Sequence, residues 1–160
     1  MAKVGRAARV ASKQRAEILG NGTGAPTAKA IQAAETGELY MINHNHGSEL
    51  EITLPPIADG AYFRFQLMLQ LQENAGSITI NKNAADAAGC IKGTVLCTVF
   101  AGSSADTTIA TNKDAGSATK LTILDDAHVG SYIEVYCDGT NWQFSGVVVA
   151  SALANAVFDA

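Results

Sequence analysis

The sequence predicts an all-β protein: an antiparallel β-sandwich or jelly-roll-like body preceded by a flexible, basic N-terminal arm. Apolar and polar residues alternate with a period of two along many short segments, and turn-forming residues separate these segments. The chain has 160 residues, of which 48% are apolar and 16% are charged, whereas typical domains carry about 25% charged residues. A core of useful size is therefore expected, and a surface so poor in charge favours contacts with other protein molecules.

Residues 130–146 predict a β-hairpin whose register follows from the sequence. Two alternating runs, 132–137 and 142–146, flank a four-residue turn at 138–141. Opposed residues of a hairpin share one face of the sheet, so one face of this hairpin is apolar and belongs to the core. The members of that face are Ile133, Val135, Cys137, Trp142 and Phe144. They are expected to be scaffold, with no catalytic role.

The body is expected to span residues 27–150, followed by a small-residue C-terminal tail at 151–160. Residues 27–34 are ambiguous between a strand and a short helix. Further strands are expected at 38–43, 49–54, 62–71, 77–81, 94–100, 107–110 and 120–124. The strand at 62–71 is the cleanest, with inward-facing Phe63, Phe65, Leu67, Leu69 and Leu71. The polar segments 82–93 and 101–119 are expected to be surface loops.

Residues 1–26 are expected to form a basic arm and a glycine-rich hinge. Residues 1–16 contain five bases and no acid, whereas the remaining residues carry 15 acids and six bases, a net charge of −9. A basic arm on an acidic body predicts that the arm binds an acidic surface. The expected binding residues are Lys3, Arg6, Arg9, Lys13 and Arg15. Because the body is acidic and poor in aromatic residues, direct nucleic-acid binding is not expected.

The sequence predicts no catalytic residue, no cofactor and no metal site. It has no phosphate-binding loop, no dinucleotide fingerprint and no nucleophile elbow. The closest approach to a metal motif is His44, His46 and Glu49, which approximates the first motif of cupins, a jelly-roll enzyme family. The gap before Glu49 is shorter than in that family, and a second cupin motif is absent. We therefore expect exposed turn histidines, with a cupin-type metalloenzyme as the alternative.

Cysteine usage and hydropathy point to folding in a reducing cytoplasm without a membrane partner. The three cysteines are Cys90, Cys97 and Cys137, an odd number without zinc-type spacing. Cys97 and Cys137 lie in strand-like runs and are expected to be small buried hydrophobic residues. No segment reaches the ~20 apolar residues of a membrane span.

A series of short motifs between residues 31 and 146 resembles β-sandwich modules of tailed-bacteriophage virions, most closely head decoration (cement) proteins. In order, the motifs are Ala33-Ala34-Glu35-Thr36-Gly37, Leu54-Pro55, Gly60 before Phe63-x-Phe65, Gly76-Ser77-Ile78-Thr79-Ile80, Ile91-x-Gly93 and Asp138-Gly139-Thr140-Asn141-Trp142. The resemblance implies a structural, non-enzymatic protein that is commonly trimeric.

On this basis we expect a homotrimer that is made in the host cytoplasm and binds the major capsid protein on the outer surface of the virion. There it would stabilise the shell by clamping neighbouring subunits. The basic arm lies outside the resemblance and is expected to reach those subunits. The alternative is a tail-fibre or receptor-binding module, in which residues 82–93 and 101–119 would form the working surface.

Overall fold

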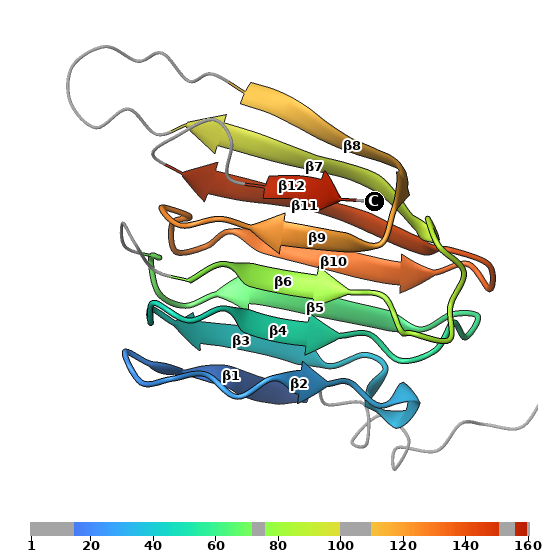
Figure 1. Cartoon of the computed structure of the whole chain (residues 1–160), viewed down its shortest axis with the longest axis horizontal. Coiled ribbons are helices and arrows are strands. Elements are labelled where there is room, and N and C mark those ends of the chain that lie inside the picture. The colour runs from blue at the N-terminus through green and yellow to red at the C-terminus, as the bar shows by residue number, and fades with distance from the viewer. Residues whose placement is uncertain (1–14, 72–75, 100–109, 151–155, 160) are drawn as a thin grey trace, which may run out of the picture.

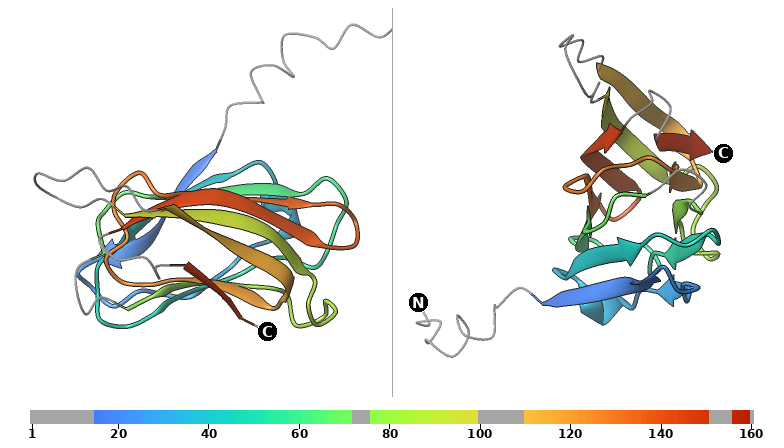
Figure 2. Two further views of the ribbon diagram at one scale, coloured as in Figure 1. Left: turned by 90° about the horizontal axis from the view of Figure 1, so that it is seen from above. Right: turned by 90° about the vertical axis from the view of Figure 1, so that its left-hand side faces the viewer.

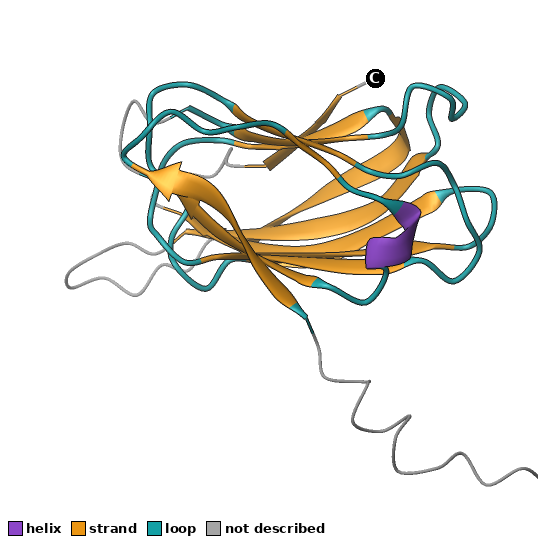
Figure 3. Cartoon of the chain, turned by 90° about the horizontal axis from the view of Figure 1, so that it is seen from below, coloured by secondary structure: helices purple, strands orange, loops and turns teal. Residues whose placement is uncertain are grey.

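The fold is a sandwich of two β-sheets, as the sequence predicts (Figure 1). A computed structural model describes residues 15–71, 76–99, 110–150 and 156–159. The larger sheet has seven strands in the order β1-β3-β5-β10-β11-β7-β8, and the smaller has five in the order β12-β9-β6-β4-β2. Figure 2 shows the two sheets as stacked layers. Figure 3 shows the short helix η1 beside them.

The strand bounds agree with most of the expected positions. The seven-stranded sheet contains β1 (Ala16–Gly22), β3 (Leu39–His44), β5 (Tyr62–Leu67), β7 (Ile91–Val99), β8 (Ala110–Ala118), β10 (Tyr132–Cys137) and β11 (Trp142–Ala150). The five-stranded sheet contains β2 (Lys29–Ala30), β4 (Leu50–Thr53), β6 (Ile78–Asn81), β9 (Lys120–Ile123) and β12 (Ala156–Asp159). The ambiguous segment 27–34 contains β2 and the start of η1 (Ala33–Glu35), so it holds both a strand and a helical turn.

The expectation of a purely antiparallel body is wrong, because both sheets are mixed. From β1 to β6 the chain alternates between the sheets, so each strand lies beside the strand two positions earlier and runs parallel to it. The first half of the body is therefore a coil that adds one strand to each sheet per turn. The second half supplies the antiparallel pairs, in which β10 lies between β5 and β11 and β9 lies between β6 and β12.

The terminal hairpin has the predicted register. Cys137 pairs with Trp142, Val135 with Phe144, and Ile133 with Gly146. In the turn, Asp138 Oδ1 accepts hydrogen bonds from the backbone N–H groups of Thr140 and Asn141 at 2.9 and 2.7 Å. These bonds satisfy donors that the hairpin ladder leaves free, and they fix the loop length that sets the register.

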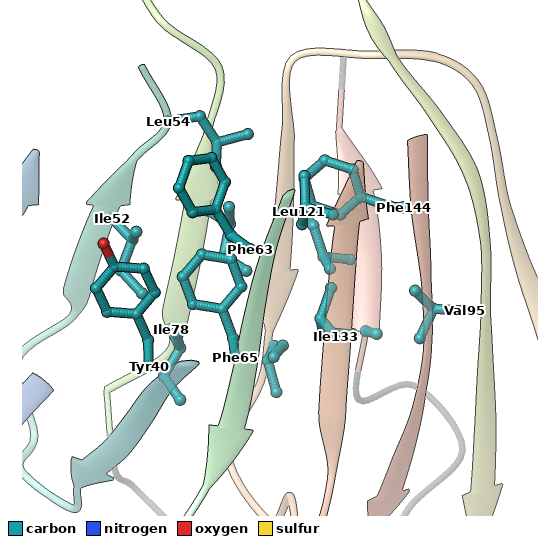
Figure 4. Packing of buried hydrophobic residues seen from close by; sticks show 14 of the residues in the cluster. Tyr40, Ile52, Leu54, Phe63, Phe65, Ile78, Val95, Leu121, Ile133 and Phe144 are labelled. Carbon is teal, nitrogen blue, oxygen red and sulfur yellow. The ribbon is translucent and has the colours of Figure 1, made fainter. Parts of the chain in front are cut away.

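The core lies between the sheets and is built from the inward-facing residues of both (Figure 4). Tyr40 stacks on Phe65 with ring centroids 5.3 Å apart, and Phe63 packs against Trp142 at 6.0 Å. The five residues predicted for the apolar face of the hairpin are all buried. The three cysteines are buried and unbridged, which confirms the prediction for Cys97 and Cys137. Burial of this apolar surface is the main stabilising term of the fold.

Several local expectations are corrected by the structure. Residues 16–22 form β1, which pairs with β3, so the body begins before the expected hinge. The expected loop 101–119 contains β8, and the expected tail 151–160 contains β12. Strand β5 ends at Leu67, and Leu69, expected to face inward, is 38% exposed. Of the expected strand at 107–110, residues 107–109 lie outside the described residues.

Candidate functional site

The predicted arm joins the body at β1, which is an edge strand of the seven-stranded sheet. Lys3, Arg6, Arg9 and Lys13 lie outside the described residues. Arg15 is described, and its side chain is 80% exposed. Its Nη1 lies 3.6 Å from Glu38 Oε1, whose side chain is only 11% exposed. The backbone carbonyl of Arg15 also accepts the N–H of Leu39 at 2.8 Å, so the base of the arm is anchored to the start of β3.

A network of charged side chains closes the first turn of the coil, between β1 and β2. Lys29 Nζ donates to Glu17 Oε2 at 2.9 Å and to Glu35 Oε1 at 2.8 Å. Carboxylate oxygens of Glu17, Glu35 and Glu38 lie within 4.8 Å of one another. The positive charge of the Lys29 ammonium therefore offsets part of the negative charge of these three carboxylates. Polar side chains at the end of a coil keep its last core layer from water, so we assign the network a structural role.

The electrostatics of the network follow from burial opposed by ion pairing. Burial alone would lower the pKa of the Lys29 ammonium, but hydrogen bonds to Glu35 and Glu17 outweigh it and raise that pKa. Burial and then the negative charges of the neighbouring glutamates raise the pKa of the Tyr40 hydroxyl beneath. A pocket of about 380 Å³ beside the network is lined by residues of β1, including Glu17, and by the connection from β1 that ends at Lys29. The raised pKa values keep Lys29 charged and Tyr40 neutral at neutral pH.

The expectation of an exposed His44 is wrong. The alternating inward positions of β3 continue through Tyr40 and Ile42 to His44, which is 1% exposed. Its Nε2 donates to the Gly76 carbonyl at 3.0 Å. His46 Nδ1 instead accepts the Ser48 N–H within the crossing loop, and Glu49 accepts from Thr79. Among the described residues, no metal-ligand group unites His44, His46 and Glu49, so the geometry gives no support to the cupin-type alternative.

Lowering the pH from about 7.5 to about 5.5 is expected to destabilise the wild type more than His44→Gln. Burial, reinforced by nearby His46, lowers the pKa of folded His44, although its bond to Gly76 opposes this shift. An unfolded histidine titrates at about pH 6.5. The contribution of neutral His44 to the free energy of unfolding is therefore fully present above that pH, and it is lost as the pH falls toward the lowered pKa of the folded state. Urea unfolding at both pH values measures the difference, and an identical pH dependence in the two proteins would contradict the prediction.

The outer face of the seven-stranded sheet carries a cluster of tyrosines around one ion pair. Arg64 Nη1 and the Tyr62 hydroxyl both donate to Glu134 Oε1 at 3.0 Å. The Arg64 guanidinium lies 4.5 Å from the Tyr132 ring centroid, and Tyr136 is 46% exposed. Burial and then the bond to Glu134 raise the pKa of the Tyr62 hydroxyl, which keeps it a donor. The sequence places Tyr132, Glu134 and Tyr136 on one face of a strand, but only the strand order brings β5 beside them.

No family model, curated protein or solved structure matches this chain. Within the described residues, no helix has the length and apolar character needed to cross a membrane.

Proposed function

We propose that this chain is a structural, non-enzymatic virion protein that binds the outside of an assembled phage capsid and stabilises it by clamping neighbouring subunits. In this proposal it is made in the host cytoplasm, assembles as a homotrimer and binds the major capsid protein. The observation that carries the proposal is the charge division between the N-terminal arm and the acidic body. The motif order that resembles virion β-modules adds to it.

The place where the arm joins the body supports this proposal. The arm enters an edge strand of the sandwich, and the guanidinium of Arg15, its last base, lies 3.6 Å from the Glu38 carboxylate. A chain anchored in this way can extend from the edge of the body to a neighbouring molecule. A single exposed ion pair contributes only about 0–1 kcal/mol. Several bases per arm, repeated across the copies of an oligomer, still give useful avidity.

The tail-fibre or receptor-binding alternative has less support from the geometry. It would use segments 82–93 and 101–119 as a working surface, but Ala110–Ala118 forms β8 and residues 91–93 begin β7. These parts are held in the ladder of the seven-stranded sheet rather than free to shape a binding loop.

Replacing Lys3, Arg6, Arg9 and Lys13 together by Gln is expected to weaken capsid binding by at least about ten-fold, because the variant arm keeps its length but loses four charges. Binding would be measured by co-sedimentation with capsids purified from a phage strain that lacks this gene. The matched control interchanges Lys and Arg at the same four positions, which preserves the charge and should preserve binding.

Added salt should weaken the wild type and leave the residual binding of the Gln variant nearly unchanged, since screening acts on the removed charges. Full occupancy of the capsid by the Gln variant, or by a chain lacking residues 1–14, would overturn the role of the arm. Absence of wild-type binding under all conditions would overturn the proposed function itself.

A further inference from the structure

The two outer faces of the sandwich differ in chemistry. On the five-stranded sheet, one transverse row across β12, β9, β6 and β4 consists of Val157, Thr122, Thr79 and Glu51. The adjacent row contains Lys120 and Asp159, whose charged groups lie 3.6 Å apart. Threonine, asparagine and charged side chains thus dominate this face, although Thr79 and Thr122 at its centre are themselves buried.

The seven-stranded sheet instead carries an apolar row across six of its strands. The strand registers align one outward-facing residue from each of β1, β3, β5, β10, β11 and β7. These residues are Ile18, Met41, Gln66, Tyr132, Val147 and Leu96. Five of the six are apolar or aromatic, and Ile18 is 60% exposed. Every described strand belongs to one of the two sheets, so no third layer of described strands covers this row.

The same face is nearly free of uncompensated charge. The strand registers place four charged residues on it, Arg64, Glu134, Lys92 and Asp114, two of each sign. Arg64 and Glu134 form an ion pair at 3.0 Å. Residues 17–160 nevertheless carry a net charge of −9. Two copies therefore repel each other through most of their surface, but this face can approach its own kind without opposing like charges. The tyrosine–arginine cluster lies on β5 and the middle strand β10, and these residue types are enriched at the centres of protein interfaces.

We propose that the outer face of the seven-stranded sheet is the surface through which this chain binds other copies of itself. The apolar row supplies the surface that is removed from water, and the Arg64–Glu134 pair, already satisfied within one copy, is not left unpaired on association. The inference rests on the proposed function for its stoichiometry, a trimer, and identifies the face that the subunits share.

Val147→Glu and Met41→Glu, made separately, are expected to convert the oligomer to a monomer. Each places a carboxylate in the apolar row of every subunit, on different strands, where it would be desolvated or meet a like charge. The matched control is Val157→Glu, the same type of substitution on the outer face of the five-stranded sheet, which should leave the oligomer intact. Molar mass would be measured by light scattering on a sizing column from about 1 to about 100 µM, with tryptophan fluorescence confirming that each variant is folded.

The wild type and Val157→Glu are expected at three times the 16.6 kDa chain mass, and the two face variants at the chain mass. A monomeric wild type over the whole concentration range, or an intact oligomer in both folded face variants, would overturn the inference. Capsid co-sedimentation separates this result from the proposed function. An oligomer that needs this face but does not bind capsids would reject only the function, and a monomeric wild type that binds them would reject only the shared face.

Discussion

Gly93→Ala is expected to reduce the free energy of unfolding by more than about 3 kcal/mol. Gly93 has φ +119°, a conformation that L-residues rarely adopt. A Cβ atom at this position would lie 2.0 Å from the carbonyl oxygen of Phe144. The obstacle is the backbone of the paired strand β11, so it cannot move aside without breaking the β7–β11 ladder. Denaturant unfolding followed by circular dichroism would measure the loss.

Gly37→Ala is the matched control for this prediction. Gly37 also has positive φ, at +87°, but a Cβ atom there meets nothing within 4 Å. Its substitution should cost only the conformational term, about 1–2 kcal/mol. The difference between the two variants therefore isolates the backbone clash. Equal destabilisation of Gly37→Ala and Gly93→Ala would show that β7 and β11 can separate without cost, and would contradict the prediction.

Local patterns predicted the elements whose partners are close in sequence. The hairpin register followed from the turn at 138–141 and from strict alternation on both sides of it, and both signals are contained in one short segment. The coil of β1 to β6 lacks such a signal, because its parallel pairs join residues on successive turns. Alternation reveals that a segment is a strand with one buried face, but it does not reveal to which sheet the strand belongs.

Glycine accounts for the misplaced boundary of the body. In the sequence, Gly20 and Gly22 indicate a hinge, but they lie in β1, which has a register irregularity between Leu19 and Gly22. A Cβ atom on Gly20 would lie 2.5 Å from the Asn43 carbonyl oxygen, so close approach to β3 explains this glycine.

The two candidate surfaces also differ in how far the sequence predicts them. The charge of the arm is visible in the sequence, whereas the apolar row of the seven-stranded sheet exists only once the strand order is known.

Trp142→Ala is expected to cost about 3–5 kcal/mol of unfolding free energy, the usual range for removing a large aromatic side chain from a core. Trp142 is fully buried and packs against Phe63. It also connects the hairpin to the segment before β7, because its backbone N–H donates to the Cys90 carbonyl at 2.9 Å and its Nε1 donates to Asp86 Oδ2 at 3.2 Å. Trp142→Ala removes the core packing and the indole hydrogen bond to Asp86, but it keeps the backbone hydrogen bond to Cys90.

Trp142→Phe separates these two contributions. The phenyl ring retains most of the apolar contact with Phe63 and loses the bond to Asp86, a side chain that is half-buried and that also accepts the Ile57 N–H at 3.0 Å. Water can reach the vacated oxygen, so the loss of this bond should cost only about 1 kcal/mol, in addition to a smaller loss of packing. Unfolding is followed by circular dichroism, because Trp142 is the only tryptophan. If Trp142→Phe were as destabilising as Trp142→Ala, the indole bond to Asp86, rather than core packing, would hold the hairpin in place.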